Sequence, residues 1–457
     1  MSKLAATVAA RILADVMAED WPVGEVFGSE AELLERYGVS RAVFREAVRL
    51  VENQQVARMR RGPGGGLVVT EPTVDAIIDA AVLYFHRVDA RLDEVFEARL
   101  ALEQLVAGLA SQRLDETGLF HLRALVDAES RGEAKDHRAL HTLLASATHN
   151  PALELFVDIL NRVTLLYFRD SKALGAGTLT ESAHAHSRIV DAVISGDDGL
   201  ARRRMRTHLE AEAAFLRRRR STRQVLDASV AMAGPAGNKG AERVARSIFR
   251  DTVANGLEPG ALLGSESELT EKYDVSRAVF REAVRILEHH QIATMRRGPG
   301  GGLFVAPPSA AAVTDVVAIF LARRGVDVKD LTETRIGVEL ALIDLLVDRM
   351  TKERAGQLRA ALQAEADSED RFVRTAHDLH ATISSLAGNR ALELVELVLI
   401  RLTRMHQVER NPRARRKMQP EVYRAHEAIV DAIVERDREL ARYRMRRHLT
   451  AVATHLA

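Results

Sequence analysis

Cysteine is absent from the 457 residues of this chain, and no apolar run is long enough to cross a membrane. Without cysteine, disulfides and thiolate metal sites are excluded. A membrane-crossing helix needs about 18–20 consecutive apolar residues. The first residues lead into a helical pattern broken by Arg11 and Asp15, which is unlike a signal peptide. We therefore expect a cytoplasmic protein that makes no membrane contact.

The chain also has little net charge, +1 at pH 7, but its charges are unevenly distributed. Residues 40–67 hold six arginines and two glutamates, a net charge of +4, and residues 276–303 hold five arginines and two glutamates, a net charge of +3. The two blocks together carry +7, which leaves −6 for the remainder. Positive charge concentrated in this way is typical of a phosphate-binding surface, although clusters of surface arginines also occur without such a role.

An internal repeat organises the chain. Residues 28–67 align without a gap with residues 264–303, at an offset of 236, and 30 of the 40 positions are identical. The likeness continues more weakly downstream, where residues 189–192 recur as residues 429–432. Two long units repeated once indicate tandem multidomain copies rather than a solenoid.

The N-terminal segment of each copy predicts three helices and a β-hairpin. Apolar residues at helical spacing mark the first helix; they are Val8, Ile12 and Val16 in the first copy and Val244, Ile248 and Val253 in the second. Ser29 and Ser265, each followed by a glutamate three positions later, start a short second helix through a capping box. Ser40 and Ser276 are placed to cap a longer third helix, which completes a helix-turn-helix pair.

The third helix of each copy carries arginines at i, i+4 and i+8, backed by an apolar face. These are Arg41, Arg45 and Arg49, and then Arg277, Arg281 and Arg285. Such a row suits the DNA major groove, where arginine contacts phosphate or pairs with guanine. Two β-prone runs around a glycine-rich loop then predict a hairpin wing that approaches DNA closely. The wing residues expected at DNA are Arg60, Arg61 and Gly64, and then Arg296, Arg297 and Gly300.

These motifs resemble the GntR family, whose pattern runs from Ser-Glu through Val-Ser-Arg and Arg-Glu-Ala to a glycine-rich wing. The resemblance implies operator contacts by the residues Ser40, Arg41 and Arg45, and by Ser276, Arg277 and Arg281. The family commonly has an arginine two positions after the first serine, where this chain has Ala31 and Ser267. We therefore expect altered contact from the second helix. Gly28 and Gly264 also stand where the family usually has proline.

The larger segment of each copy has helical periodicity throughout, which predicts a bundle whose interior can hold a ligand. It resembles the FCD sensing domain of the FadR-like branch of the family, and this implies a divalent metal, zinc or nickel, bound by an aspartate and three histidines. The matching histidines are His141, His186 and His208, and then His380, His426 and His448. His137 replaces the aspartate in the first copy and Ala376 replaces it in the second, so a metal is expected more in the first copy.

Arg99 and Arg335 are the residues expected to bind the effector, a carboxylic acid or an acyl-CoA, because arginine pairs strongly and directionally with carboxylates. In a purely structural interpretation, each arginine instead pairs with the glutamate four residues later, Glu103 or Glu339. Two further alternatives are a pocket that binds an organic acid without a metal and a pocket that has lost sensing.

The sequence thus predicts a mainly α protein with two winged helix-turn-helix domains and two all-α bundles. The expected parts are a winged domain at 1–72, a sensing domain at 73–223, a linker at 224–241, a winged domain at 242–308 and a sensing domain at 309–457. We expect a metabolite-responsive transcriptional repressor that binds a double-stranded DNA operator as an intramolecular pseudo-dimer, and not an enzyme. The alternatives are a metal-dependent enzyme and an architectural DNA-binding protein. A homodimer of chains stays possible.

Overall fold

The computed structural model describes residues 3–60, 62, 64–133, 138–166, 176–219, 239–296, 298–367, 372–408 and 412–456. The chain divides into two compact units. The first takes in the described parts of residues 1–84 and 228–323, and the second those of residues 85–227 and 324–457. Each unit therefore combines segments from both copies of the repeat. Among the described residues, no helix is both long and apolar enough to cross a membrane.

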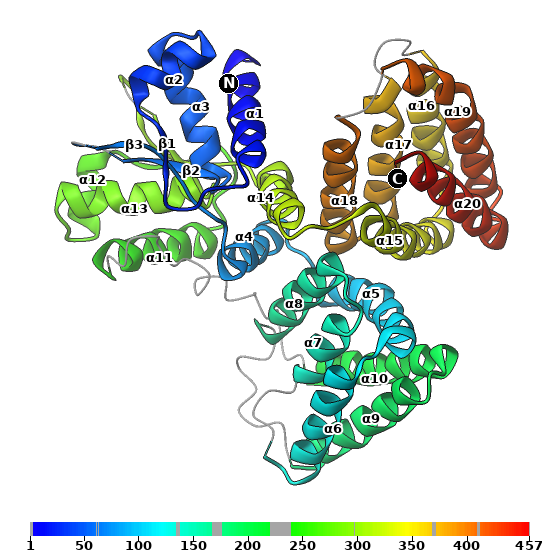
Figure 1. Ribbon diagram of the computed structural model, residues 1–457. Coiled ribbons are helices and arrows are strands. Elements are labelled where there is room, and N and C mark those ends of the chain that lie inside the picture. Colours follow the sequence, from blue (N-terminus) through cyan, green and yellow to red (C-terminus); the bar gives the residue numbers. More distant parts are fainter. Residues whose placement is uncertain are drawn as a thin grey trace. The chain divides into compact units, whose positions relative to one another are not determined.

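In the first copy, three helices pack with a three-stranded antiparallel sheet of order β1-β3-β2 (Figure 1). The elements are α1 (Lys3–Ala18), β1 (Val26–Gly28), α2 (Glu30–Tyr37), α3 (Arg41–Asn53), β2 (Ala57–Arg60) and β3 (Gly66–Val69). This confirms the predicted helices and hairpin and adds β1, which no periodicity predicted. Ser29 caps α2 in a capping box with Glu32, and Ser40 caps α3 by accepting a hydrogen bond from the Val43 amide.

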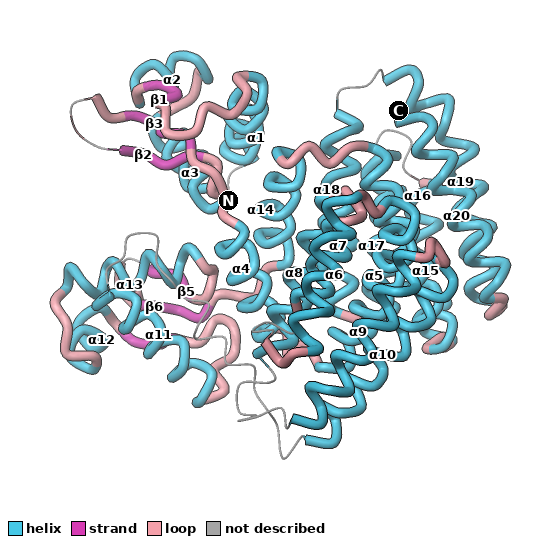
Figure 2. The backbone as a smooth tube through the Cα atoms, turned by 60° about the horizontal axis from the view of Figure 1, so that its bottom comes forward, coloured by secondary structure: helices cyan, strands magenta, loops and turns pink. Residues whose placement is uncertain are grey.

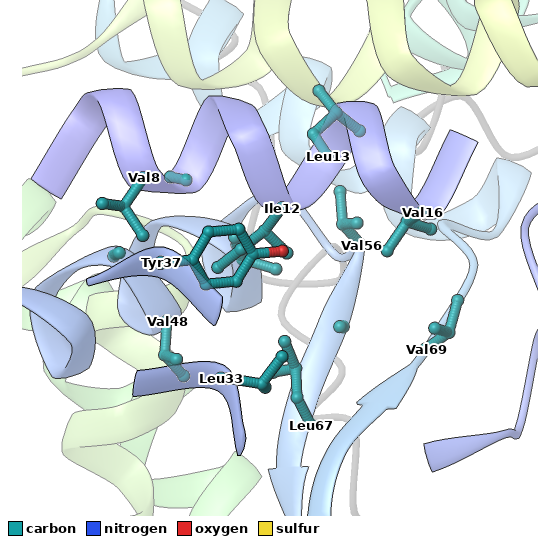
Figure 3. Close-up of a cluster of buried hydrophobic side chains, with 14 of the residues drawn as sticks. Val8, Ile12, Leu13, Val16, Leu33, Tyr37, Val48, Val56, Leu67 and Val69 are labelled. Carbon is teal, nitrogen blue, oxygen red and sulfur yellow. The ribbon is translucent and has the colours of Figure 1, made fainter. Parts of the chain in front are cut away.

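A buried apolar cluster joins the helices of the first copy to its sheet (Figure 3). Val8, Ile12 and Val16 of α1 are at most 1% exposed, as their helical spacing predicts. They belong to one cluster with Leu67 and Val69 of β3. Full burial of side chains of this size stabilises a fold by roughly 1.5–3 kcal/mol each. Because α3 gives its apolar face to the same cluster, its opposite face points outward.

The second copy repeats this arrangement, with a sheet of order β4-β6-β5. The elements are α11 (Lys239–Ala254), β4 (Leu262–Gly264), α12 (Glu266–Lys272), α13 (Arg277–His289), β5 (Ala293–Arg296) and β6 (Gly302–Val305). One residue of the predicted apolar stripe is wrong. Val253 is 38% exposed, whereas Val244 and Ile248 are buried. Val253 lies five residues after Ile248, which turns it off that face, and Thr252 is buried in its place.

The last glycine of each glycine-rich loop, Gly66 or Gly302, is required by the packing of the strands in the sheet. A Cβ on Gly66 would lie 2.5 Å from the carbonyl oxygen of Gly28, and the equivalent approach at Gly302 is 2.7 Å. No side chain fits there, so these glycines let two strands pass closely. Gly64 and Gly300, at the wing tips, differ because their φ angles are 68° and 73° and nothing surrounds them. The tips are therefore turns that stay open to a partner.

The helix that follows the second winged domain packs against the first winged domain, so the two copies are in contact within the first unit. The connecting helices are α4 (Val74–Arg87) and α14 (Ala310–Arg323). Although α14 follows the second winged domain in the chain, its Ile319 belongs to the core cluster of the first. Asp315 accepts a hydrogen bond from Gln54 Nε2 at 3.3 Å, and Arg323 donates two to Glu71 at 2.8 and 3.0 Å. No signal in the sequence predicted this crossover.

The second unit contains two helical bundles, which confirms the predicted fold class. The first bundle consists of α5 (Leu92–Arg113), α6 (Glu116–Ser130), α7 (Ala139–Ser146), α8 (Pro151–Leu166), α9 (Ala176–Ile194) and α10 (Asp198–Arg219). The second consists of α15 (Val328–Asp348), α16 (Lys352–Ala366), α17 (Phe372–Ala387), α18 (Arg390–Val408), α19 (Pro412–Val434) and α20 (Arg438–Leu456). The first helix of each bundle is central, because α5 packs against α7–α10, and α15 against α17–α20. Figure 2 shows the described parts of both bundles as helices joined by loops, whereas the strands belong to the winged domains.

Candidate functional site

The predicted arginine rows lie on the solvent side of α3 and α13. Arg41, Arg45 and Arg49 are exposed in the first copy, as are Arg277, Arg281 and Arg285 in the second. Arg45 Nε lies 3.6 Å from Glu30 Oε1, and Arg281 Nε donates to Glu266 Oε1 at 2.9 Å. Ion pairs this exposed are weak, typically 0–1 kcal/mol. The guanidinium groups are thus held loosely at the surface, where phosphates or base edges can replace their carboxylate partners.

The wings add positive charge beside these helices. Arg60 Nη2 donates to the carbonyl oxygen of Gly64 at 2.8 Å and so braces the first wing tip. In the second copy, the Arg296 guanidinium lies 4.2 Å from the ring centroid of Phe304. The predicted contacts Arg61 and Arg297 lie outside the described residues. Ser40 and Ser276 are exposed at the helix starts, where their hydroxyl oxygens are occupied as caps.

The three histidines predicted in the first bundle come together in its interior. His141 of α7, His186 of α9 and His208 of α10 are each at most 9% exposed. The Nε2 atoms of His186 and His208 are 3.3 Å apart, and the His141 ring centroid lies 5.8 and 5.3 Å from the other two. One ring nitrogen from each residue falls within 4.8 Å of the others. The fold thus brings together the side chains of His141 and His208, which are 67 positions apart in the sequence.

Carboxylates fix the outer nitrogens of these rings. His141 Nδ1 donates to Glu103, and His186 Nδ1 donates to Glu129 at 2.8 Å. Burial alone would raise the pKa of Glu103, but Arg99 and His141 beside it bring that pKa to about 2. The carboxylate is therefore ionised and can only accept. Burial lowers the pKa of His186 and lowers that of His208 further. A neutral imidazole held at Nδ1, as that of His186 is, has its Nε2 available as a ligand.

The second bundle repeats this arrangement almost atom for atom. His380, His426 and His448 are at most 6% exposed, and the Nε2 atoms of the last two are 3.2 Å apart. His380 Nδ1 donates to Glu339 at 2.5 Å and His426 Nδ1 donates to Glu365 at 2.8 Å. Burial lowers the pKa of His380 and, more strongly, that of His448. The two histidine clusters are therefore chemically alike.

Sequence reasoning missed the carboxylates behind the histidines. Glu129 and Glu365 were not predicted, although both are buried and stand at the 236-residue offset of the repeat. The signal in the sequence that could have found them is a glutamate at matched positions of the two copies. Glu103 and Glu339 were expected only as partners of Arg99 and Arg335. The structure shows that each of them bridges its arginine and a histidine.

Arg99 and Arg335, the predicted effector residues, are almost completely buried, at 1% and 4% exposure. Arg99 Nε donates to Glu103 at 2.6 Å and its Nη1 to Glu212 at 2.9 Å. The structural interpretation of these arginines, an ion pair with the glutamate four residues later, therefore describes a real contact. It does not exclude a ligand at Arg99, because this arginine also borders a cavity.

A cavity of about 800 Å³ opens beside the first histidine cluster. Its wall includes Arg99 and all three clustered histidines, together with apolar surface from Leu165 and Phe215. Further cations on its wall are Arg138, Arg188, Arg203, Arg204 and Arg218. The volume is within the range of small-molecule sites. A cavity with several arginines and an apolar side suits an anionic organic molecule.

The histidine clusters fit a divalent metal. Each offers three buried histidines, two of which have a carboxylate at Nδ1, and three protein ligands leave a coordination position for a ligand. The predicted fourth residue, His137, lies outside the described residues. Its counterpart Ala376 belongs to α17 and has no ligand atom in its side chain. The described residues bring three histidine nitrogens together in each cluster, and in the second bundle Glu339 and Glu396 also lie with His380 at the spacing of metal ligands.

Comparisons with known proteins match both parts of each copy. Residues 4–67 and 240–305 match the family described as bacterial regulatory proteins, gntR family. Residues 94–211 and 330–451 match the FCD domain. The first pair of matches covers the winged segments with their arginine rows, and the second covers the bundles with their histidine clusters.

Relatives align with less than half of the chain each. The transcriptional regulator LutR of Bacillus subtilis (strain 168) is 27% identical over 196 residues, which are 41% of this chain and 89% of LutR. The galactonate operon transcriptional repressor of Escherichia coli (strain K12) is 26% identical over 207 residues, 44% of this chain and 89% of the repressor. A solved structure of a Streptococcus agalactiae GntR protein covers 46% of this chain, with 22% identity and a TM-score of 0.34.

Proposed function

The chain belongs to the gntR family of bacterial regulatory proteins, with two copies each of its DNA-binding domain and the FCD effector-binding domain, and we propose that it is a metabolite-responsive repressor. Repression is supported by the similar Escherichia coli protein, whose name describes it as a repressor. The matched proteins are transcriptional regulators, so the expectation that the chain is not an enzyme is confirmed.

Both winged domains read DNA in this proposal, and they read similar half-sites. Residues 39–49 and 275–285 are identical, so the two helices present the same side chains in the same order. Their arginines are exposed in both copies. Base contacts specify sequence, whereas phosphate contacts mainly position the protein. Two identical rows therefore predict an operator with two similar half-sites.

The pseudo-dimer is supported by paired contacts between the bundles within the second unit. Arg113 pairs with Glu333, and at the equivalent positions Arg349 pairs with Glu97 at 2.7 Å. The Asn150 side-chain amide donates to the Asp330 carbonyl oxygen at 3.0 Å, and the Asn389 amide donates to the Glu94 carbonyl oxygen at 2.9 Å. Contacts that recur with the partners exchanged are typical of a twofold dimer interface. Here both sides belong to one chain.

We place the effector, a carboxylic acid or an acyl-CoA, in the cavity of the first bundle. The histidine clusters would hold zinc or nickel, and a bound divalent cation supplies a positive charge to which a carboxylate can coordinate. Arg99 and the arginines of the cavity wall would bind the remaining negative charge. Effector binding changes operator affinity because binding energy at one site is coupled to binding at the other.

A gel-shift titration of the full chain tests the reading of two half-sites by one molecule. The operator is first selected from random duplex DNA by binding to the wild-type chain. Arg45→Ala and Arg281→Ala should each weaken specific binding by about 5- to 150-fold, the cost of one lost base contact. The double variant should bind this operator no better than unrelated DNA.

Arg359→Ala is the matched control, because Arg359 is an exposed arginine on α16, away from the winged domains. It should leave operator affinity unchanged. Specific binding that survives in the Arg45→Ala, Arg281→Ala double variant would refute the contact assignment. Equal affinity of the wild-type chain for one and for two half-sites would refute the pseudo-dimer.

A further inference from the structure

The interface between the two bundles has paired contacts on both sides, but some of its positions differ between the two sides. Gly337 of α15 packs against Leu105 of α5, and a Cβ on Gly337 would lie 2.6 Å from Leu105 Cδ2. Two carbon atoms cannot lie so close together, so a side chain at position 337 would force Leu105 Cδ2 to move out of its place. Leu105 therefore fills space that exists because position 337 has no side chain.

The repeat shows what stands on the other side of the interface. The offset of 236 residues that aligns Arg99 with Arg335 aligns Ala101 with Gly337, and Leu105 with Ala341. One side thus has a leucine against a glycine, and the equivalent positions on the other side both hold alanine. A protrusion and a matching recess are therefore divided between the two bundles.

Pairing of like bundles would lose this fit. Two first bundles joined through the same surface would set each Leu105 against the methyl group of Ala101, which overpacks the contact twice. Two second bundles would set Gly337 against Ala341 and leave the volume of a leucine unfilled twice. Only the pairing of a first with a second bundle fills the recess.

A charged contact shows the same inequality. Arg390 Nη1 lies 3.3 Å from Glu94 Oε2 and donates to the Asp89 carbonyl oxygen at 2.6 Å. Glu94 is only 3% exposed. The first copy has Pro151 at the position of Arg390. A pair of first bundles would therefore remove this arginine from two buried Glu94 carboxylates and leave each with Arg91 of its own bundle, whose Nε lies 3.8 Å away. Loss of one cation beside a buried carboxylate is costly.

We propose that Leu105 and Gly337, supported by Arg390 and Glu94, are pairing determinants that direct the first bundle to the second and disfavour pairing of like bundles from different chains. This inference rests on the proposed pseudo-dimer, and it specifies that each first bundle pairs with a second bundle. A chain with two similar interfaces risks joining other chains into open assemblies. Unequal interfaces, together with the millimolar effective concentration that a covalent link gives, favour closure within one chain.

Cysteine cross-linking tests which bundles meet, and the chain has no native cysteine to interfere. Arg113→Cys with Glu333→Cys marks the unlike pairing, since these residues touch between the bundles. Arg113→Cys with Glu97→Cys reports a pair of first bundles, and Arg349→Cys with Glu333→Cys a pair of second bundles. In each control the two positions lie 16 residues apart along α5, or along α15 and its C-terminal cap Arg349. Because this separation is about 24 Å, a short bismaleimide cannot join them within a bundle.

The unlike pair should cross-link within single chains, which then migrate as monomers in a denaturing gel. The two control pairs should give no covalent dimer. A covalent dimer from either control pair at comparable yield would overturn the proposal. Cross-linking of the unlike pair between chains would uphold the pairing determinants and refute the self-contained pseudo-dimer, so the two ideas fail separately.

A double-mutant cycle tests the Leu105–Gly337 contact itself. Alanine in place of a helical glycine normally stabilises a helix, and Gly356→Ala on α16 provides that reference because nothing lies near this glycine. Gly356→Ala should raise the thermal midpoint, whereas Gly337→Ala should lower it. In a Leu105→Ala background, Gly337→Ala should raise the midpoint as well. An equal rise from Gly337→Ala in both backgrounds would overturn the proposed role of this pair.

Discussion

The two bundles contain the same buried chain of arginine, glutamate and histidine, but they surround it differently. In the first, Arg99 donates to Glu212 of α10, which is 22% exposed and lines the cavity. In the second, Arg335 Nη2 lies 3.6 Å from Glu396 of α18, which is completely buried. The second acidic partner of the arginine therefore lies on a cavity wall in the first bundle and in the core of the second bundle.

The sequence positions behind this difference are few. Glu396 stands where the first bundle has the buried residue Val157, and Val452 stands where it has Glu212. In the proposed function, Arg99 would exchange the partly exposed Glu212 for the anion of a ligand, whereas Arg335 would have to give up the completely buried Glu396. Residues 39–49, by contrast, are identical to residues 275–285, a run of eleven residues that includes most of α3 and of α13. The two copies differ in the bundles and agree in the winged domains.

Removal of one histidine from each cluster tests whether the two bundles bind metal alike, since both contain the same three-histidine cluster. Because the two clusters have the same ligands and the same carboxylates behind them, the wild-type chain should bind two zinc ions. His208→Ala and His448→Ala should each reduce this number to one, and the double variant should bind none. Glu129→Gln and Glu365→Gln should weaken the corresponding site about 10- to 100-fold. Elemental analysis and competition with a chelator measure both effects.

His137→Ala provides the control for the predicted fourth ligand. If His137 completes the first site, this variant binds zinc more weakly at that site and with unchanged affinity at the second site. A wild-type chain that binds one zinc ion and loses it in His137→Ala would contradict the equivalence of the clusters. It would also show that the substitution of Ala376 decides metal binding in the second bundle.

The two bundles differ in the second glutamate beside the buried arginine, which is Glu212 beside Arg99 and Glu396 beside Arg335. Replacing each of these glutamates with glutamine tests this difference. Glu212→Gln keeps the side-chain shape but removes the charge that competes for Arg99, so an anion in the cavity should bind about tenfold more tightly. A gain of one tenfold step corresponds to about 1.4 kcal/mol. Succinate serves as a general dicarboxylate probe, and calorimetry on the zinc-loaded chain measures its affinity.

Glu396→Gln is the matched control for this titration. Because Glu396 is buried away from solvent, its neutralisation should leave the affinity for succinate unchanged. Equal gains from the two variants would show that both bundles bind the probe and would break the comparison. No gain from Glu212→Gln would show that Glu212 does not compete with a ligand for Arg99.

Local sequence signals predicted much of the fold and of the site. Serine caps, helical spacing and the glycine-rich hairpin placed the winged elements, because each signal acts over a few neighbouring residues. The histidine clusters followed from their spacing and from the family resemblance. Their geometry could not be predicted, because it depends on how α7, α9 and α10 pack around α5.

The features that sequence reasoning missed all depend on distant contacts. Ile319 has the pattern of an ordinary core residue, and nothing in its neighbourhood indicates that it joins the core of the other winged domain. Glu396 lies on α18 beside the buried residue Val395, and only the fold shows that its partner is Arg335. Composition and spacing describe one segment at a time, whereas these contacts join segments more than sixty residues apart.

The smallest expected effect is on stability, and it concerns Glu396 alone. Burial raises the pKa of Glu396 well above its ordinary value of 4.5, and the nearby Glu339 carboxylate adds to the rise. The folded chain therefore keeps a proton that the unfolded chain releases above about pH 4.5. The stabilising contribution is complete below that pH and is lost as the pH rises toward the folded pKa, by up to ~1.4 kcal/mol per pH unit.

Glu396→Gln removes this dependence, because glutamine stays neutral in both states. In chelator-treated protein, the variant should be more stable than the wild type, and the gap should widen by a few degrees in thermal midpoint between pH 5 and pH 8. Glu212→Gln, at the partly exposed position, separates this burial effect from the mere loss of a charge beside an arginine. A constant gap across the pH range would mean that Glu396 is ionised in the folded chain. The second bundle would then carry a buried negative charge balanced by Arg335, as the first does at its cavity.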